Sequence, residues 1–269
     1  MFVVGALALF VGVLVVRTPR NAAPRPTPQP ATPATGADTT ARSQQRASSQ
    51  PTTSPTTNDV ALNVTRSATP APTRNIDDIR ARIAATPGTY MPSMLSDLNE
   101  QLVRWPDRRE QGLRVWVQSI TPVRDWNLRY AQMARDAFAD WGGGGDGGGL
   151  PIRLDFVLDS ATSDVQIVWL ERFGPELGRR VGNTRRTTDQ NGWLVAAQIV
   201  VAIHDSAGRT IPPDNLAGIV RHEAGHALGL GHSADPKTKM FPVETVSDIQ
   251  PADRATLRLL YQLPPGLVR

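Results

Sequence analysis

Three of the four histidines in this 269-residue chain fall within one stretch of eleven residues. His222 and His226 are four residues apart, so on a helix their imidazoles would share one face. Gly229 allows the chain to turn sharply after such a helix, and the turn would bring His232 back toward the other two. Three histidines at this spacing can bind one zinc ion and leave its fourth position to water. We expect Glu223, which follows the first histidine, to lie beside that water.

The chemistry that such a site predicts is hydrolysis of a peptide bond without a covalent intermediate. Zinc lowers the pKa of a bound water to about 7 and polarises a substrate carbonyl. Glu223 is the expected general base toward the water and then the general acid toward the leaving amine. A bare H-E-x-x-H pattern is only moderately specific, whereas the full H-E-x-x-H-x-x-G-x-x-H pattern is strongly predictive.

This stretch resembles the active-site motif of the metzincin zinc endopeptidases, and within them the matrixins. Ser233 follows the third histidine, as a serine does in matrixins. Met240 is similar to the family's Met-turn methionine, which lies beneath the metal; a core methionine would be compatible with that role. Asp253 is similar to an acid of the family's last helix, which braces the Met-turn backbone, although a helix-dipole role fits the sequence equally well. The resemblance covers about residues 110–263.

The resemblance implies a zincin-like α/β (α+β) fold. Its parts would be a twisted five-stranded mixed sheet, two long helices, of which one carries the motif, and a small C-terminal subdomain with the Met-turn and a final helix. It also implies that the stretch 197–203 is the antiparallel edge strand against which an extended substrate lies. The segment 241–246 would then wall the pocket for the side chain after the scissile bond.

One catalytic zinc is the only metal ion that we expect. The family's second, structural zinc uses histidines after the third strand, but the stretch 171–192 contains none, and His204 is expected to be a satisfied surface histidine. Asp189 and Asp205 are carboxylates that could hold calcium, but no pattern fixes such a site. Because the chain has no cysteine, latency through a thiolate on the zinc is excluded; the segment 76–105 is a candidate for another form of latency.

Hydrophobic patterning predicts the elements that would position these residues. Alternating apolar residues predict strands at 113–117, 152–158, 165–169 and 193–203. Helical spacing predicts helices at 76–84, 126–141, 214–228 and 251–262. Asp125 is the expected N-cap of the second of these helices, and the polar, glycine-rich stretch 171–192 is expected to be a long loop.

Composition divides the chain into four zones. These are a hydrophobic signal or anchor segment (1–17), a disordered linker rich in Pro, Thr, Ala and Ser (18–75), a pre-domain segment with a short helix (76–109) and the catalytic domain (110–269). Residues 2–16 have no polar side chain, but as a helix they would span roughly 22 Å, short of the roughly 30 Å hydrocarbon core of a membrane. The absence of a clear A-x-A cleavage site favours a retained anchor slightly over a cleaved signal peptide.

The charge distribution argues against nucleic acid as a partner. Residues 17–75 contain seven arginines and two aspartates, whereas residues 76–269 carry 22 basic and 23 acidic residues. The basic excess therefore lies in the tail, while a nucleic-acid-binding domain carries its basic face on the domain itself. We expect a monomer that acts on proteins or peptides outside the cytoplasm, either secreted or tethered to a membrane through residues 2–16.

The leading hypothesis is thus a zinc metalloendopeptidase. One alternative is a non-enzymatic, surface-tethered binding module on a metzincin fold, which would be expected to have lost Glu223 or a histidine. Another is a zinc amidase that acts on cell-wall peptides, which only the pocket and cleavage assays would distinguish.

Overall fold

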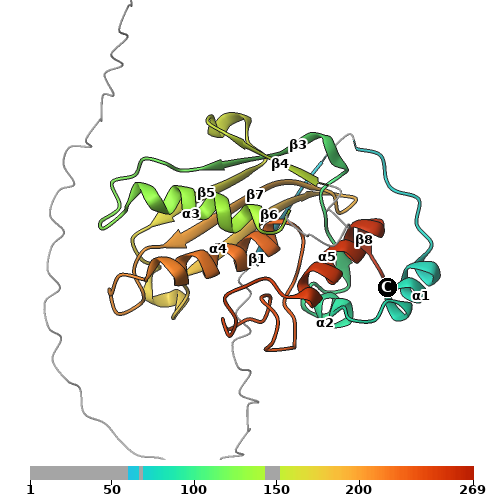
Figure 1. Ribbon diagram of the computed structural model, residues 1–269. Helices are drawn as coiled ribbons and strands as arrows, with labels where there is room; N and C mark the ends of the chain where they lie inside the picture. Colours follow the sequence, from blue (N-terminus) through green and yellow to red (C-terminus); the bar gives the residue numbers. More distant parts are fainter. Residues whose placement is uncertain (1–59, 67–68, 143–151) are drawn as a thin grey trace, which may run out of the picture. The chain divides into compact units, whose positions relative to one another are not determined.

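The computed structural model describes residues 60–66, 69–142 and 152–269 (Figure 1). The hydrophobic segment 2–16 and most of the predicted linker lie outside these described residues. Within the described ranges, no helix is long and apolar enough to cross a membrane.

The described residues form five helices and eight strands. The helices are α1 (Ile76–Ala85), α2 (Met91–Asp97), α3 (Leu128–Ala139), α4 (Pro213–Ala227) and α5 (Pro251–Gln262). The strands are β1 (Val60–Thr65), β2 (Gln101–Leu102), β3 (Arg108–Val117), β4 (Ile152–Val157), β5 (Val165–Leu170), β6 (Gly182–Asp189), β7 (Leu194–Ala202) and β8 (Gly266–Leu267). The four predicted helices and the four predicted strand regions are therefore present, with small shifts at their ends.

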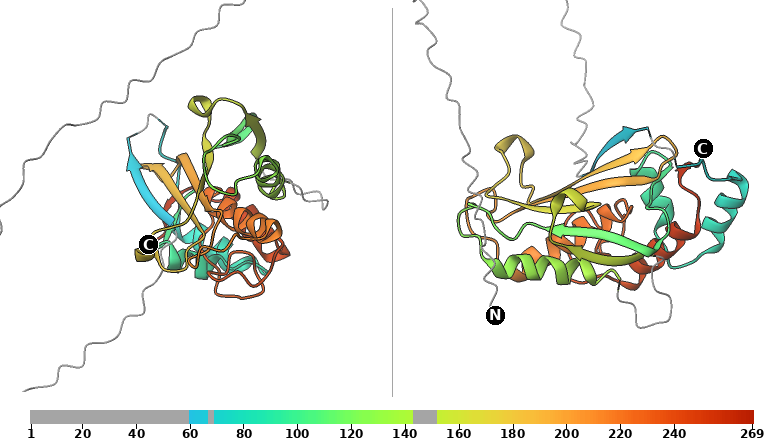
Figure 2. Two further views of the ribbon diagram at one scale, coloured as in Figure 1. Left: turned by 90° about the vertical axis from the view of Figure 1, so that its left-hand side faces the viewer. Right: turned by 90° about the horizontal axis from the view of Figure 1, so that it is seen from above.

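A six-stranded mixed sheet carries the fold, in the order β1-β6-β7-β5-β3-β4. Neighbouring strands run parallel, except that β6 and β7 form an antiparallel hairpin. Helices α3 and α4 pack against each other on one face of this sheet (Figures 1 and 2). The zincin-like α/β fold is thus confirmed, with one strand more than the five expected.

The additional strand comes from the range that the sequence assigned to the disordered linker. β1 pairs in parallel with β6, from Val60 opposite Thr184 to Thr65 opposite Asp189. The β1 sequence, VALNVT, is rich in β-branched residues, which favour strands. Composition averaged over residues 18–75 hides such a short segment.

The prediction of a long loop over residues 171–192 is also wrong, because this range contains β6. The turn between β6 and β7 closes with a hydrogen bond from the N–H of Gly192 to the carbonyl of Asp189, and Gly192 has a φ of 87°, as the residue after the turn in a longer hairpin loop often does. As a result β7 lies inside the sheet, between β6 and β5. The prediction that residues 197–203 form the edge strand is therefore wrong. The strand that pairs antiparallel with β7 is β6.

The N-cap of α3 is Asn127 rather than Asp125. The Asn127 side chain accepts a hydrogen bond from the backbone N–H of Arg129, which satisfies one of the free donors at a helix start. Asp125, two residues earlier, has a φ of 60° and its carboxylate lies 2.8 Å from Nε2 of His204.

Helices α1 and α2 pack beside α5, at the end of the fold that also carries β8 (Figure 1). Arg82 donates a hydrogen bond to the carbonyl of Gln262, and the backbone N–H of Tyr90 donates one to the hydroxyl of Thr256. Buried apolar residues of both helices belong to the same hydrophobic core as the sheet. The segment 76–109, predicted to precede the domain, is therefore part of the domain's packed structure.

Candidate metal centre

Helix α4 positions the first two histidines of the motif and the glutamate between them. His222, Glu223 and His226 lie in its last two turns and are all buried. The chain then turns at Gly229, whose φ is 112°. A Cβ at this position would lie 2.3 Å from the carbonyl oxygen of Val103, so both backbone conformation and packing require glycine here.

The three histidines are brought together as the sequence predicted. One ligand atom from each of His222, His226 and His232 lies within 4.8 Å of the others. The Nε2 atoms of His222 and His226 are 3.1 Å apart. Two nitrogens bound tetrahedrally to one zinc ion at roughly 2.0–2.1 Å would be about 3.3–3.4 Å apart. The described residues therefore fit one zinc ion.

The other ring nitrogen of each histidine contacts a hydrogen-bond acceptor. Nδ1 of His222 lies 2.9 Å from the carbonyl oxygen of Lys239, and Nδ1 of His226 lies 2.9 Å from that of Leu230. Because a carbonyl oxygen can only accept, Nδ1 must carry the proton in these two contacts. The lone pair of the neutral ring is then on Nε2, the atom that faces the other histidines.

Burial keeps these imidazoles neutral at ordinary pH. The pKa of His222 is lowered to about 4, mainly because burial removes solvation, and the nearby charges of His232 and Lys239 act in the same direction. The pKa of His226 is also well below its usual value, again because burial removes solvation. Neutral imidazole is the form that binds a metal ion, so His222 and His226 need not lose a proton before they bind a cation.

Strand β6 lies directly beside Glu223. The hydroxyl of Thr184 donates to Oε2 of Glu223 over 2.6 Å. A Cβ at Gly182 would lie 2.4 Å from Oε1 of the same carboxylate. Residues 182, 184 and 186 share one face of the strand, since side chains alternate along it, and Arg186 reaches the carbonyl of Leu230. This row could not be predicted from the sequence, because residues 171–192 were expected to form a loop.

Met240 and Asp253 contact the segments that carry and support His222. Met240 is fully buried, and a Cβ at Gly225 of α4 would lie 2.4 Å from its sulfur. The carboxylate of Asp253 accepts hydrogen bonds from the backbone N–H groups of Lys239 and Met240. Asp253 therefore joins the start of α5 to the turn at Lys239, whose carbonyl accepts a hydrogen bond from Nδ1 of His222.

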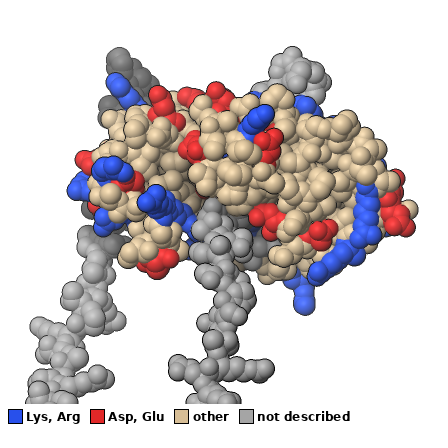
Figure 3. All heavy atoms as spheres, turned by 90° about the horizontal axis from the view of Figure 1, so that it is seen from below, with Lys and Arg blue, Asp and Glu red and all other residues tan. Residues whose placement is uncertain are grey.

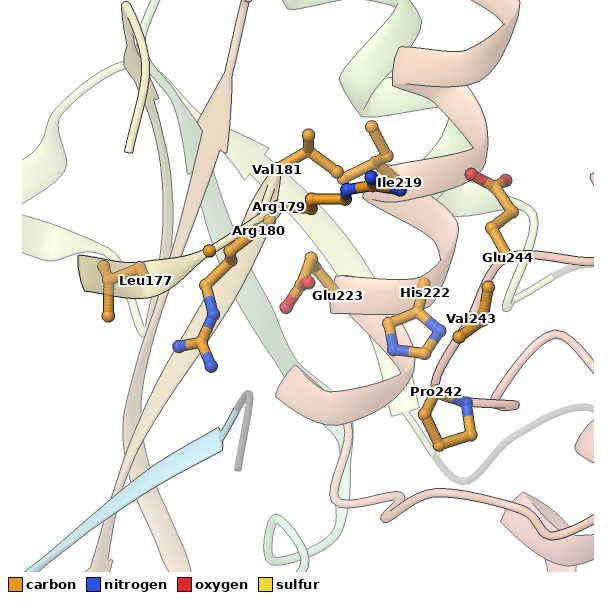
Figure 4. Close-up of a pocket in the computed structure, with 12 residues that line it drawn as sticks. Leu177, Arg179, Arg180, Val181, Ile219, His222, Glu223, Pro242, Val243 and Glu244 are labelled. Carbon is orange, nitrogen blue, oxygen red and sulfur yellow. The ribbon is translucent and has the colours of Figure 1, made fainter. Parts of the chain in front are cut away.

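A pocket of about 460 Å³ opens next to His222 and Glu223. One wall is the segment 177–182 and the opposite wall is 242–244, and both side chains at the site face into the space between them (Figure 4). The predicted pocket segment 241–246 thus lies beside the histidine site. The lining is mainly apolar, with Arg179, Arg180 and Glu244 adding charge near its rim.

His204 and the two suggested calcium ligands lie away from the histidine site. His204 is buried rather than at the surface, with its ring nitrogens 2.8 Å from Asp125 and 3.2 Å from the carbonyl of Glu171. Asp189 and Asp205 follow opposite ends of the β6–β7 hairpin, so the structure does not bring them together. Within the described residues, the three motif histidines form the one cluster suited to a metal ion.

Acidic and basic side chains both occur on the face shown in Figure 3. Among the described residues, several charged side chains pair with a neighbour one or two positions away, such as Arg109 with Asp107 and Arg153 with Asp155. Such pairs are typical of an ordinary solvated surface.

The mixed sheet, the two packed helices and the buried histidine cluster define a protein of the zincin-like metalloprotein class. The matrixin (peptidase M10) family model matches residues 128–262, half of the chain. The chain belongs to the matrixin family, whose members are zinc metalloproteases. A comparison with curated proteins found no match.

Proposed function

We propose that this protein is a zinc-dependent endopeptidase whose metal ligands are His222, His226 and His232. The observation that carries the proposal is the convergence of three buried imidazoles beside Glu223 and an open pocket. When bound, zinc supplies Lewis-acid chemistry, which makes water acidic enough to attack at neutral pH and polarises the substrate carbonyl.

Glu223 is the residue proposed to move the proton. Its carboxylate lines the pocket next to His222 and is held by the hydroxyl of Thr184. In this position it accepts a proton from the attacking water and returns it to the amide nitrogen of the leaving group. Met240 and Asp253 are proposed to support the site by fixing the turn that contacts His222.

The proposed substrate is an extended protein segment beside the start of β6. The start of β6 adjoins the pocket, since Gly182 is among the residues that line it. An extended peptide can lie along a strand while one of its side chains enters a neighbouring pocket. We propose that the pocket between 177–182 and 242–244 receives the side chain after the scissile bond.

We also propose that the protein acts outside the cytoplasm. Matrixins are typically extracellular, and residues 2–16 have the composition of a signal or anchor segment. Fractionation of cells that express the full chain tests this: we expect the protein in the membrane or the medium. Recovery of the full-length protein only from the soluble cytoplasm would contradict it.

The function is tested by incubating the zinc-loaded full chain with an unfolded protein and, separately, with cross-linked cell-wall peptides. We expect cleavage at internal peptide bonds of the protein, located by mass spectrometry, that stops on chelation and returns when zinc is added. Zinc binding without cleavage of either substrate would favour a binding module. Cleavage confined to the cell-wall peptides would favour an amidase.

A further inference from the structure

Asp97, the last residue of α2, contacts the third histidine of the motif twice. Its Oδ2 accepts a hydrogen bond from the backbone N–H of His232 over 2.9 Å, and its Oδ1 lies 3.2 Å from Nδ1 of the same residue. The two residues are 135 positions apart in the sequence. Asp97 also lies outside the range 128–262 that the family model matches.

Asp97 differs in charge from the groups that hold the other two histidines. His222 and His226 each face a neutral backbone carbonyl, whereas His232 faces a carboxylate. A carboxylate on the far nitrogen of a metal-binding histidine fixes its tautomer and ring orientation and makes it a stronger ligand. Asp97 is therefore suited to hold Nε2 of His232 toward the other two histidines.

His232 has more need of such support than the other two histidines. His222 and His226 are fixed by α4, but His232 lies in the loop after Gly229, outside any helix or strand. The end of α2 packs closely on this loop, since a Cβ at Gly231 would lie 2.8 Å from Leu98 and 2.9 Å from Oδ2 of Asp97. The loop and the carboxylate are thus held in contact through both packing and hydrogen bonds.

Buried Arg186 on β6 supplies the balancing charge for Asp97. Its guanidinium is fully buried and close enough to attract that carboxylate. It also lies within 3.4 Å of the carbonyl of His226 and 3.3 Å of that of Leu230, and the Leu230 carbonyl holds Nδ1 of His226. The guanidinium of Arg186 therefore interacts with groups that hold two of the histidines. These are the carboxylate of Asp97, which contacts His232, and the carbonyl of Leu230, which contacts His226.

We propose that Asp97 is a positioning residue of the metal site, which orients His232 and strengthens its binding to the ion. This inference rests on the proposed zinc function and extends it, since it makes α2 part of the metal centre. The site then depends on residues well before the H-E-x-x-H-x-x-G-x-x-H motif.

The test is the zinc dissociation constant of the full chain, measured by competition with a chelator of known affinity. We expect Asp97→Ala to weaken zinc binding by about 10–100-fold, the loss typical of removing such a partner. Asp97→Asn keeps an oxygen acceptor but loses the charge, and we expect an intermediate loss. Ser96→Ala, at the exposed neighbouring position, is the matched control and should bind zinc as the wild type does.

Two further readouts separate positioning from a purely structural role. Metal-free Asp97→Asn should still unfold in one cooperative transition, at a lower melting temperature because buried Arg186 loses its balancing charge, and the absorption spectrum of its cobalt complex should change. An unchanged zinc affinity in folded Asp97→Asn would overturn this inference alone, because the wild type would still bind zinc. Absence of zinc binding by the wild type would overturn both this inference and the proposed function.

Discussion

The hydroxyl of Thr184 on β6 donates a hydrogen bond of 2.6 Å to the carboxylate of Glu223 on α4. Both residues are buried, and the same hydroxyl lies 3.1 Å from the backbone carbonyl of Glu223. A carboxylate held in this way has few orientations available. Thr184 therefore fixes the direction in which the proposed general base presents its other oxygen, Oε1.

Replacement of Thr184 by valine, which has the same shape, removes the hydroxyl and with it both contacts with Glu223. We expect kcat to fall by about 10–100-fold, because a hydrogen bond to a charged group contributes about 1.5–3 kcal/mol and each 1.36 kcal/mol is tenfold in rate. KM and zinc content should change little, and Thr184→Ser, which keeps the hydroxyl, should recover most of the rate. Equal kcat in the valine variant and the wild type would show that the contact is not used.

Gly182 tests the space around the same carboxylate. A Cβ at this position would lie 2.4 Å from Oε1 of Glu223 and 2.8 Å from Ile219, so Gly182→Ala must push Glu223 out of place. We expect one zinc per chain to remain while cleavage falls at least tenfold, since small displacements of catalytic groups are costly. In the control Gly142→Ala the nearest atom would be 3.4 Å away, and activity should be unaffected. Full activity of Gly182→Ala would contradict the position given to Glu223.

The metal-binding stretch could be predicted because its information is local. Two histidines one turn apart and a glycine that permits a turn are readable from eleven consecutive residues, and the structure places all three histidines together. The core periodicities of α3, α4 and α5 were likewise readable, since each buries one face against the sheet or its neighbour.

The supports of the site could not be read in the same way. β6 is polar on both faces because its inner face contacts Glu223 and the loop carbonyls, so its sequence lacks the hydrophobic alternation that indicates a strand. The Asn191-Gly192 turn was the one local signal for its hairpin. Asp97 offers no local signal at all, because it meets His232 only through the packing of α2 on the loop after Gly229.

Asp164 is expected to make the stability of the sheet depend on pH. Burial alone would raise the pKa of Asp164, but hydrogen bonds from Arg114 and the charges of Arg114 and Arg108 outweigh burial, so its pKa lies below the usual value. A carboxyl group with a lowered pKa stabilises the fold above its unfolded-state pKa of about 3.9 and loses this contribution as pH falls through its folded-state value.

The measurement is urea unfolding of the wild type and Asp164→Asn at pH 7 and again near pH 3. We expect the variant to be less stable by about 1–3 kcal/mol at pH 7 and the difference to shrink at low pH. Asp155→Asn, which breaks an exposed ion pair with Arg153, should have little effect at either pH. A difference that grows as pH falls would contradict the lowered pKa of Asp164.

The most direct test of the account compares the full-length wild type with Glu223→Gln, for zinc content and for cleavage of an unfolded protein. The amide has the shape of the carboxylate but cannot take a proton from water. We expect one zinc per chain in both proteins and a cleavage rate that is lower by about 10²–10⁴-fold in the variant. Cleavage by Glu223→Gln at the wild-type rate, or a wild type that binds no zinc, would contradict it.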